Sequence, residues 1–140
     1  MSLASKKKAA LVGLIHGNSV LLAKRSEFWR GQKVNLGGHW ALFGGSIEDG
    51  ESPSFAASRE LMEEAQIYIS HQDFVFFKCI QDSEWDLYIH FTEVASLIIP
   101  TLDEEHEESG WFNIDALNSF PHKIDSKIVS AILDYKSQQS

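Results

Sequence analysis

Residues 45–67, GSIEDGESPSFAASRELMEEAQI, decide what the rest of the chain must build. On an α-helix Glu60, Glu63 and Glu64 fall within an arc of roughly 100°, one turn apart. Like charges at this spacing repel by roughly 0.2–0.5 kcal/mol per pair, and no lysine lies one turn away to offset them. A solvated acidic face is the ordinary explanation, but convergent carboxylates are also what Mg²⁺ requires, with water and phosphate completing its shell. We therefore predict a metal site for phosphate chemistry.

The same stretch predicts where the helix begins and which side faces the core. Ser52 is a suitable N-cap, and Pro53 suits the first helical position. Ala56 and Ala57, one turn before the acids, are expected to keep the acidic face low and open. Four side chains are expected to form an apolar stripe on the opposite side, namely Phe55, Leu61, Met62 and Ala65.

This stretch resembles the Nudix box, G-x5-E-x7-R-E-U-x-E-E-x-G-U with U apolar, of the Nudix hydrolase superfamily that includes MutT-like proteins. Residue frequencies of about 5–7 per cent make a chance match of this length rarer than about one in a million. Gln66 stands where the family has Gly, at a helix end that favours left-handed backbone. Gln66 must therefore accept that conformation or end the helix differently. The matching positions are Gly45, Glu51, Arg59, Glu60, Leu61, Glu63, Glu64 and Ile67.

The resemblance covers nearly the whole chain and implies an α/β fold, the Nudix α/β/α sandwich with a mixed β-sheet between helices. It implies that Glu60 and Glu64 bind Mg²⁺, with Mn²⁺ as the alternative, and that Glu63 is a further ligand or binds a metal-bound water. A metal of this kind neutralises phosphate oxygens and lowers the pKa of its water. Arg59 would be held by Glu51, which would fix the direction of the carboxylates.

A second acidic run, DEEHEE at 103–108, resembles the family's E-H-x-E-x-x-W segment. This resemblance implies Glu105 or Glu108 as the general base. Residues 40–45, WALFGG, resemble the W-x-L-P-G-G lead into the box, with Phe43 in place of Pro. Phe43 is expected in the core, and a place in the pocket wall is the alternative.

The candidate substrate-binding residues lie outside the helix. Arg25 matches the basic residue that ends an LLxxR-like strand in the family, although a surface charge closing a strand explains it equally well. Gly44 and Gly45 would let the backbone approach phosphate closely. Trp29 offers a stacking surface within residues 26–39. Asp125 is the nearest match to a polar residue that contacts the base near the start of the last helix in MutT-type members.

Composition sets the limits on size and partners. A chain of 140 residues that is 44% apolar has the size of one domain, so we expect a single domain over 1–140, with 1–7 as a flexible lead-in. The net charge of −8 argues against a nucleic-acid partner. No apolar run reaches the length of a membrane span, which is about 18 residues or more. The N-terminus lacks the hydrophobic core of a signal peptide. We therefore expect a cytoplasmic protein without a membrane partner, as a monomer or a homodimer.

Periodicity and turn residues outline the other elements. Residues 26–39 carry three glycines and predict a loop. The single cysteine, Cys79, is expected in the core of a strand, and the six dispersed histidines are expected to have structural or surface roles. The expected extended segments are 9–16, 20–23, 67–69, 73–80 and 86–94, followed by a helical turn at 115–119 and a helix at 125–136.

Three functions are compatible with these features, and each has a nucleotide or a nucleoside diphosphate-linked small molecule as partner. The first is a Mg²⁺-dependent hydrolase of a phosphoanhydride bond, a nucleoside triphosphate pyrophosphohydrolase of the MutT-like kind. The second is a pyrophosphatase acting on a nucleotide sugar or ADP-ribose. The third is a sensor module that binds nucleotide without cleaving it. Such modules often lose box carboxylates, whereas this chain keeps all of them.

Overall fold

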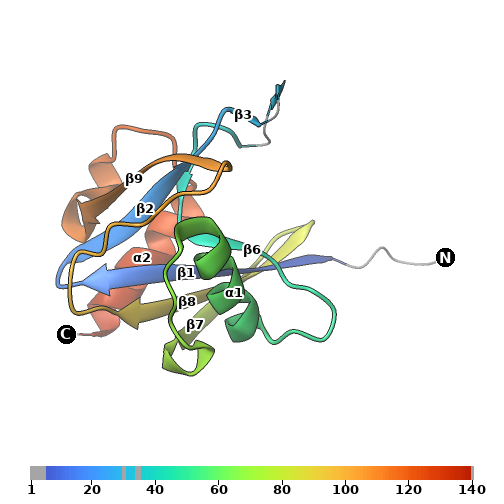
Figure 1. The fold of residues 1–140 in the computed structure, drawn as a ribbon. Coiled ribbons are helices and arrows are strands. Elements are labelled where there is room, and N and C mark those ends of the chain that lie inside the picture. The colour runs from blue at the N-terminus through green and yellow to red at the C-terminus, as the bar shows by residue number, and fades with distance from the viewer. Residues whose placement is uncertain (1–5, 30, 34–35, 140) are drawn as a thin grey trace.

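A mixed β-sheet forms the centre of the computed structural model, which describes residues 6–29, 31–33 and 36–139 (Figure 1). The sheet order is β5-β2-β1-β8-β7, with β6 also paired to β1 and β9 to β2. β1 and β8 are parallel, and the other pairs are antiparallel. The strands are β1 (Lys7–His16), β2 (Ser19–Arg25), β5 (Trp40–Ala41), β6 (Phe43–Ser46), β7 (Val75–Gln81), β8 (Trp85–Glu93) and β9 (His106–Asn113).

Two helices cover the two faces of this sheet. In the view of Figure 1, α1 (Pro53–Ala65) lies in front of the sheet and α2 (Ser126–Gln138) behind it. Each helix closes its own apolar cluster, one containing Leu61 and Phe43 and the other containing Ile132 and Phe91. The expected α/β/α sandwich with a mixed sheet is therefore confirmed. Neither helix is long and apolar enough to cross a membrane.

The ends of α1 follow the sequence prediction. Ser52 is the N-cap, and its hydroxyl accepts a hydrogen bond of 3.2 Å from the backbone N–H of Phe55. Pro53 occupies the first turn, where its missing N–H costs nothing. At the other end Gln66 adopts φ +55° and its N–H donates to the carbonyl of Met62 at 3.0 Å. The residue in place of the family Gly thus accepts left-handed backbone.

The buried side of α1 is rotated from the predicted one. Phe55 and Met62, expected in the core, are 49% and 48% exposed, whereas Ala56 and Ala57 are fully buried. Two small side chains let the helix approach the sheet closely, and the stripe that faces the sheet runs through them and Leu61. The acids therefore lie along the edge of the buried stripe, not opposite to it.

Several other expectations are corrected in detail. Residues 26–39 contain a short hairpin of β3 (Phe28–Trp29) and β4 (Gln32–Lys33), whose two-residue strands are too short to show a sequence period. Residues 67–69 form no strand; the chain continues to the 3₁₀ turn η1 (His71–Asp73). Of the expected lead-in 1–7, Lys7 begins β1 and Lys6 pairs with Asp86 at 2.7 Å; residues 1–5 lie outside the described residues.

The remaining elements agree with the pattern. β7 and β8 are the predicted strand pair, and the predicted helical turn is η2 (Ile114–Ser119). Residues 125–136 contain most of α2, which buries Ile128, Ile132 and Tyr135. Cys79 lies on β7, as expected, but is only half-buried.

Candidate active site

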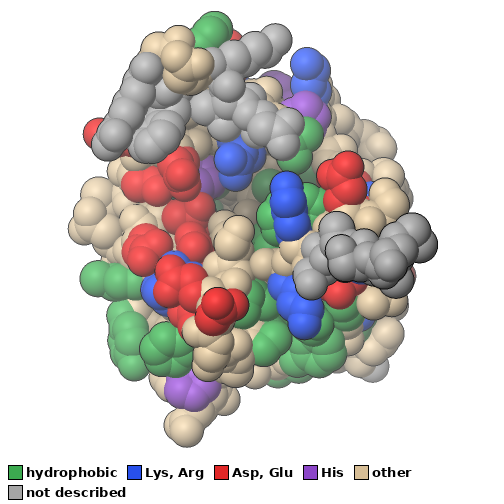
Figure 2. Space-filling view, turned by 90° about the vertical axis from the view of Figure 1, so that its right-hand side faces the viewer, with side chains coloured by type: hydrophobic (Ala, Val, Ile, Leu, Met, Phe, Trp, Pro, Cys, Tyr) green, Lys and Arg blue, Asp and Glu red, His purple; other side chains and the backbone are tan. Residues whose placement is uncertain are grey.

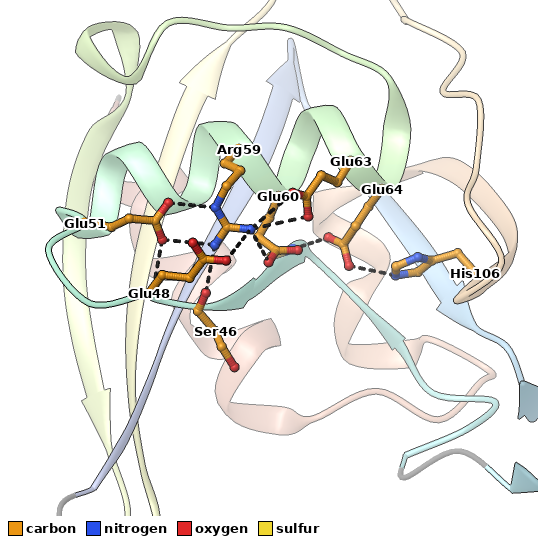
Figure 3. A network of polar contacts seen from close by, with 9 residues as sticks. Ser46, Glu48, Glu51, Arg59, Glu60, Glu63, Glu64 and His106 are labelled. Carbon is orange, nitrogen blue, oxygen red and sulfur yellow. Dashed lines mark hydrogen bonds and ion pairs between the residues drawn. The ribbon is translucent and has the colours of Figure 1, made fainter.

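Arg59 organises the carboxylates of α1 (Figure 3). Its Nε and Nη2 donate to the two oxygens of Glu51 at 2.6 and 3.0 Å, and Nη1 donates to Glu60 at 3.0 Å. Further contacts join it to Glu63 and to the carbonyl of Ser46. The guanidinium lowers the pKa of Glu51, and Glu51 in turn raises the pKa of Arg59. The expected Glu51–Arg59 pair is present, and it holds the N-terminal loop of the box against the helix.

Glycine at position 45 leaves room for the carboxylate of Glu60. A Cβ on Gly45 would lie 2.6 Å from the Glu60 carboxyl carbon, closer than real Cβ contacts allow. Burial raises the pKa of Glu60, and its hydrogen bond from Arg59 opposes that rise. Gly45 was predicted to let the backbone approach phosphate closely. In the structure its missing side chain lets the carboxylate of Glu60 lie against β6.

Glu64 is the most deeply buried of the acids, with 3% of the residue exposed. Its Oε1 accepts a hydrogen bond of 2.8 Å from the backbone N–H of Gly44. The φ of Gly44 is +155°, and a Cβ added at this position would collide with the carbonyl oxygen of Ala10. Burial raises the pKa of Glu64 to about 9, against the effect of the Gly44 bond. The charges of Glu60, Asp103 and Glu105 contribute to this rise of the pKa. A carboxylate in this setting needs a cation to remain ionised.

His106 and Asp103 complete the buried end of the cluster, and sequence reasoning missed both. The Nε2 of His106 lies 3.9 Å from Oε2 of Glu64, and its Nδ1 lies 2.9 Å from Oδ1 of Asp103. One ligand atom from each of the three residues lies within 4.8 Å of the others. The sequence predicted only structural or surface roles for the histidines, and His106 lies in this group of possible ligands. The available signal was its position inside the acidic run already singled out.

The two candidates for the general base separate in the structure. Glu105 lies close enough to the cluster for its charge to raise the pKa of both Glu60 and Glu64. Glu108 lies on β9 opposite Lys24 of β2, whose Nζ is 3.8 Å from its carboxylate. The geometry therefore favours Glu105, and Glu108 has a lysine partner elsewhere.

Arg25 ends β2 as the cross-strand partner of His106, so the two side chains leave the same face of the sheet. Its Nε is buried and has no hydrogen-bond partner among the described residues. The same holds for Nδ1 of His39, whose carbonyl accepts the N–H of Arg25 at 2.9 Å. A guanidine nitrogen and a ring nitrogen that lack a partner are suited to an anionic ligand.

The charge pattern of the surface agrees with this arrangement. Figure 2 shows acidic side chains gathered in a column on one face, with Lys and Arg side chains beside them. A metal would bind to the acidic side chains, and a phosphate would lie between that metal and the basic side chains. Such a complex would use both the acidic and the basic part of this face. The carboxylates and the imidazole form a donor set that fits a divalent cation.

One predicted substrate contact, Asp125, is not brought to this cluster. Asp125 is the N-cap of α2, and its carboxylate accepts from the N–H of Lys127 at 2.8 Å. Trp29 belongs to β3, but its side chain lies outside the described part of the chain. Phe43 is 1% exposed, and the centroid of its ring lies 5.3 Å from that of His106. The prediction that Phe43 is a core residue is therefore confirmed.

Comparison with known proteins agrees with the box. The NUDIX domain model matches residues 6–132. The NAD-capped RNA hydrolase NudC of Pseudomonas syringae pv. tomato is 30% identical over 112 residues, which are 79% of this chain and 37% of NudC. The chain thus spans little more than a third of that relative.

Solved structures share the fold. The MutT protein of Methanosarcina mazei Go1 has a TM-score of 0.76 at 19% identity, with 99% of both chains covered. The NUDIX domain of Shewanella oneidensis NrtR, solved in complex with ADP ribose, has a TM-score of 0.78 at 14% identity and covers 99% of this chain and 91% of that one. Because the family model spans most of the chain and the box acids converge, this protein belongs to the NUDIX domain family.

Proposed function

We propose that the chain is a divalent-metal-dependent hydrolase that cleaves a phosphoanhydride bond of a nucleoside diphosphate derivative. The observation that carries this proposal is the Arg59-organised set of carboxylates, with Glu64 buried against Gly44 and Glu60 against Gly45. The buried Glu64 is costly to ionise unless a cation binds it. Arg59 contacts Glu48, Glu51, Glu60 and Glu63 but does not reach Glu64.

Each residue has a definite task in this proposal. Glu60 and Glu64 would hold the cation, and the exposed Glu63 would bind it directly or through water. A bound Mg²⁺ or Mn²⁺ neutralises phosphate oxygens and acidifies water. Arg25 donates to a non-bridging phosphate oxygen. Glu105 accepts the proton of the water whose oxygen attacks phosphorus, while the bridging P–O bond breaks and its electrons leave with the second phosphate.

A nucleoside triphosphate is the first substrate to test, as the sequence suggested, and the shared fold of the Methanosarcina mazei MutT protein supports it. ADP-ribose and dinucleotide pyrophosphates form the second class. They are favoured by the names of two similar proteins, one a hydrolase of NAD-capped RNA and the other a domain bound to ADP ribose. A small nucleotide is the proposed partner in both cases, because a net charge of −8 opposes binding to an RNA backbone.

The test is phosphate and pyrophosphate release from a panel of nucleoside triphosphates, oxidised nucleotides, nucleotide sugars, ADP-ribose and dinucleoside polyphosphates, with Mg²⁺, Mn²⁺ or EDTA. Metal-dependent cleavage of one class supports the hydrolase and names its substrate. Glu63→Gln and Glu64→Gln should each remove most of this turnover while the protein stays folded. Glu84→Gln, in the exposed turn between β7 and β8, is the matched control. Tight nucleotide binding without cleavage across the whole panel would establish the sensor function instead.

A further inference from the structure

We infer that His106 is a nitrogen ligand of the metal centre, that Asp103 is the positioning residue behind it, and that this mixed donor set selects Mn²⁺ over Mg²⁺ more strongly than the box carboxylates alone. The inference rests on the proposed function, because it concerns the same metal. It adds to the box acids a ligand from a different part of the chain, β9, and a choice of metal.

The first step is the tautomer of His106. Oδ1 of Asp103 lies 2.9 Å from Nδ1 and also accepts the backbone N–H of Glu105 at 3.1 Å. An ionised carboxylate can only accept, so the ring proton lies on Nδ1. In the neutral imidazole, which is the form that binds a metal, Nε2 then carries the lone pair. The ring is held in this orientation by burial, with 7% of the residue exposed, and by the packing of Phe43.

The second step is where that lone pair points. Nε2 faces Oε2 of Glu64 at 3.9 Å, which is beyond hydrogen-bonding distance. Two ligand atoms that face each other at this separation leave space for one cation, since metal–ligand bonds of about 2.0–2.2 Å to each atom span it. Oε1 of Glu64 already accepts the backbone N–H of Gly44, and this hydrogen bond directs Oε2 toward His106.

The third step is the arrangement around the ring. A histidine that binds a metal through one nitrogen commonly donates its other N–H to a carboxylate, which fixes the ring and increases its basicity. Asp103, His106 and Glu64 form this sequence of contacts, and each is at least partly buried. A structural histidine requires only the Asp103 bond, whereas a metal ligand also needs a second donor opposite its free nitrogen, and Glu64 supplies one at 3.9 Å.

The chemistry of the donors then decides the metal. Mg²⁺ takes oxygen ligands and water almost exclusively. A nitrogen donor suits first-row transition ions better than it suits Mg²⁺. Because Mn²⁺ is the transition ion proposed for this site, replacing one oxygen by Nε2 shifts the preference from Mg²⁺ toward Mn²⁺. We therefore expect Mg²⁺ to bind through the carboxylates with little help from His106 and Mn²⁺ to bind with His106 in its shell.

The test uses tag-free full-length protein with one equivalent of Mn²⁺ and pulsed EPR, which detects a directly bound nitrogen through its nuclear coupling. We expect a ¹⁴N coupling in the wild-type protein that becomes a ¹⁵N coupling when the histidines are labelled with ¹⁵N. His106→Gln should lose the coupling. His71→Gln, altered on the opposite side of α1 where the ring packs on Phe55, should keep it. Absence of any histidine coupling in wild-type protein with Mn²⁺ bound overturns the inference, whether or not the variants fold.

Affinities provide the second readout. His106→Gln should weaken Mn²⁺ binding by about 10–100-fold, measured from the free Mn²⁺ signal, and should weaken Mg²⁺ binding, measured by competition, by less than about threefold. Asp103→Asn should keep the coupling and lose part of the Mn²⁺ affinity. An unchanged Mn²⁺/Mg²⁺ affinity ratio in His106→Gln contradicts the inference. If the wild-type protein hydrolyses a substrate but shows no nitrogen coupling, only this inference is refuted. If it neither binds metal nor hydrolyses any substrate, the proposed function is refuted.

Discussion

Replacing Glu64 by glutamine should make the metal-free protein more stable above pH 5. The pKa of Glu64 rises from its ordinary value of 4.5 to about 9 on folding, chiefly by burial. Between these two values the unfolded chain has lost a proton that the folded protein keeps. The free energy of unfolding therefore falls as the pH rises, by about 1.4 kcal/mol per pH unit for this group alone. The loss begins near pH 4.5 and is complete above pH 9.

The magnitude follows from the width of that window. From pH 4.5 to pH 7 is 2.5 units, which corresponds to at most about 3 kcal/mol. Glutamine has no carboxyl proton to lose, and its side-chain oxygen can still accept the Gly44 N–H. Glu64→Gln should therefore match the wild-type protein near pH 5 and exceed it by up to about 3 kcal/mol at pH 7, with a larger gain toward pH 9.

The assay is urea unfolding followed by tryptophan fluorescence in EDTA at several pH values from 5 to 9. Glu63→Gln is the control, because its side chain is 57% exposed, and it should follow the wild-type pH dependence. Saturating Mn²⁺ should reverse the order, since the ionised wild-type site binds the metal and the folded state gains from binding. Parallel pH profiles for wild-type and Glu64→Gln protein would refute the reasoning, and so would a variant less stable at every pH.

Three further substitutions test the site. Arg59→Lys removes the two-pronged contact with Glu51 and should lower kcat by about 10–100-fold with the fold unchanged by circular dichroism. Gly45→Ala places a Cβ against the carboxylate of Glu60; calorimetric titration should show about tenfold weaker metal binding, and wild-type affinity would contradict the packing argument. Arg25→Ala should raise KM about tenfold with a smaller change in kcat, because one charge-assisted phosphate contact is lost; an unchanged KM would return Arg25 to a surface role.

The local features of α1 were accessible from sequence because they depend on neighbours in the chain. Ser52 caps the helix through a residue three positions on, and Arg59 meets Glu51 within the same short stretch. The strand pair β7–β8 is equally local, since both strands flank one turn. Matching the box also identified the acids as a group, although their roles remain predictions.

The rotation of α1 could not be predicted in the same way. Hydrophobicity alone placed Phe55 and Met62 in the core, but close approach of the helix to β1 and β6 requires small side chains, and Ala56 and Ala57 provide them. Which stripe of a helix is buried depends on the shape of the surface opposite it as well as on apolar content. That surface is built by strands far away in sequence.

What the sequence by itself determined is the set of acids, the bounds of their helix and the family with its fold. What only the tertiary structure decided is the state of each acid: Glu64 buried with a raised pKa, Glu63 exposed, and His106 and Asp103 brought to Glu64 from about forty residues further along the chain. The physical reason is that residue type and spacing specify which groups are available, whereas burial and charge neighbours, which set a group's pKa and its ligands, come from contacts between distant segments.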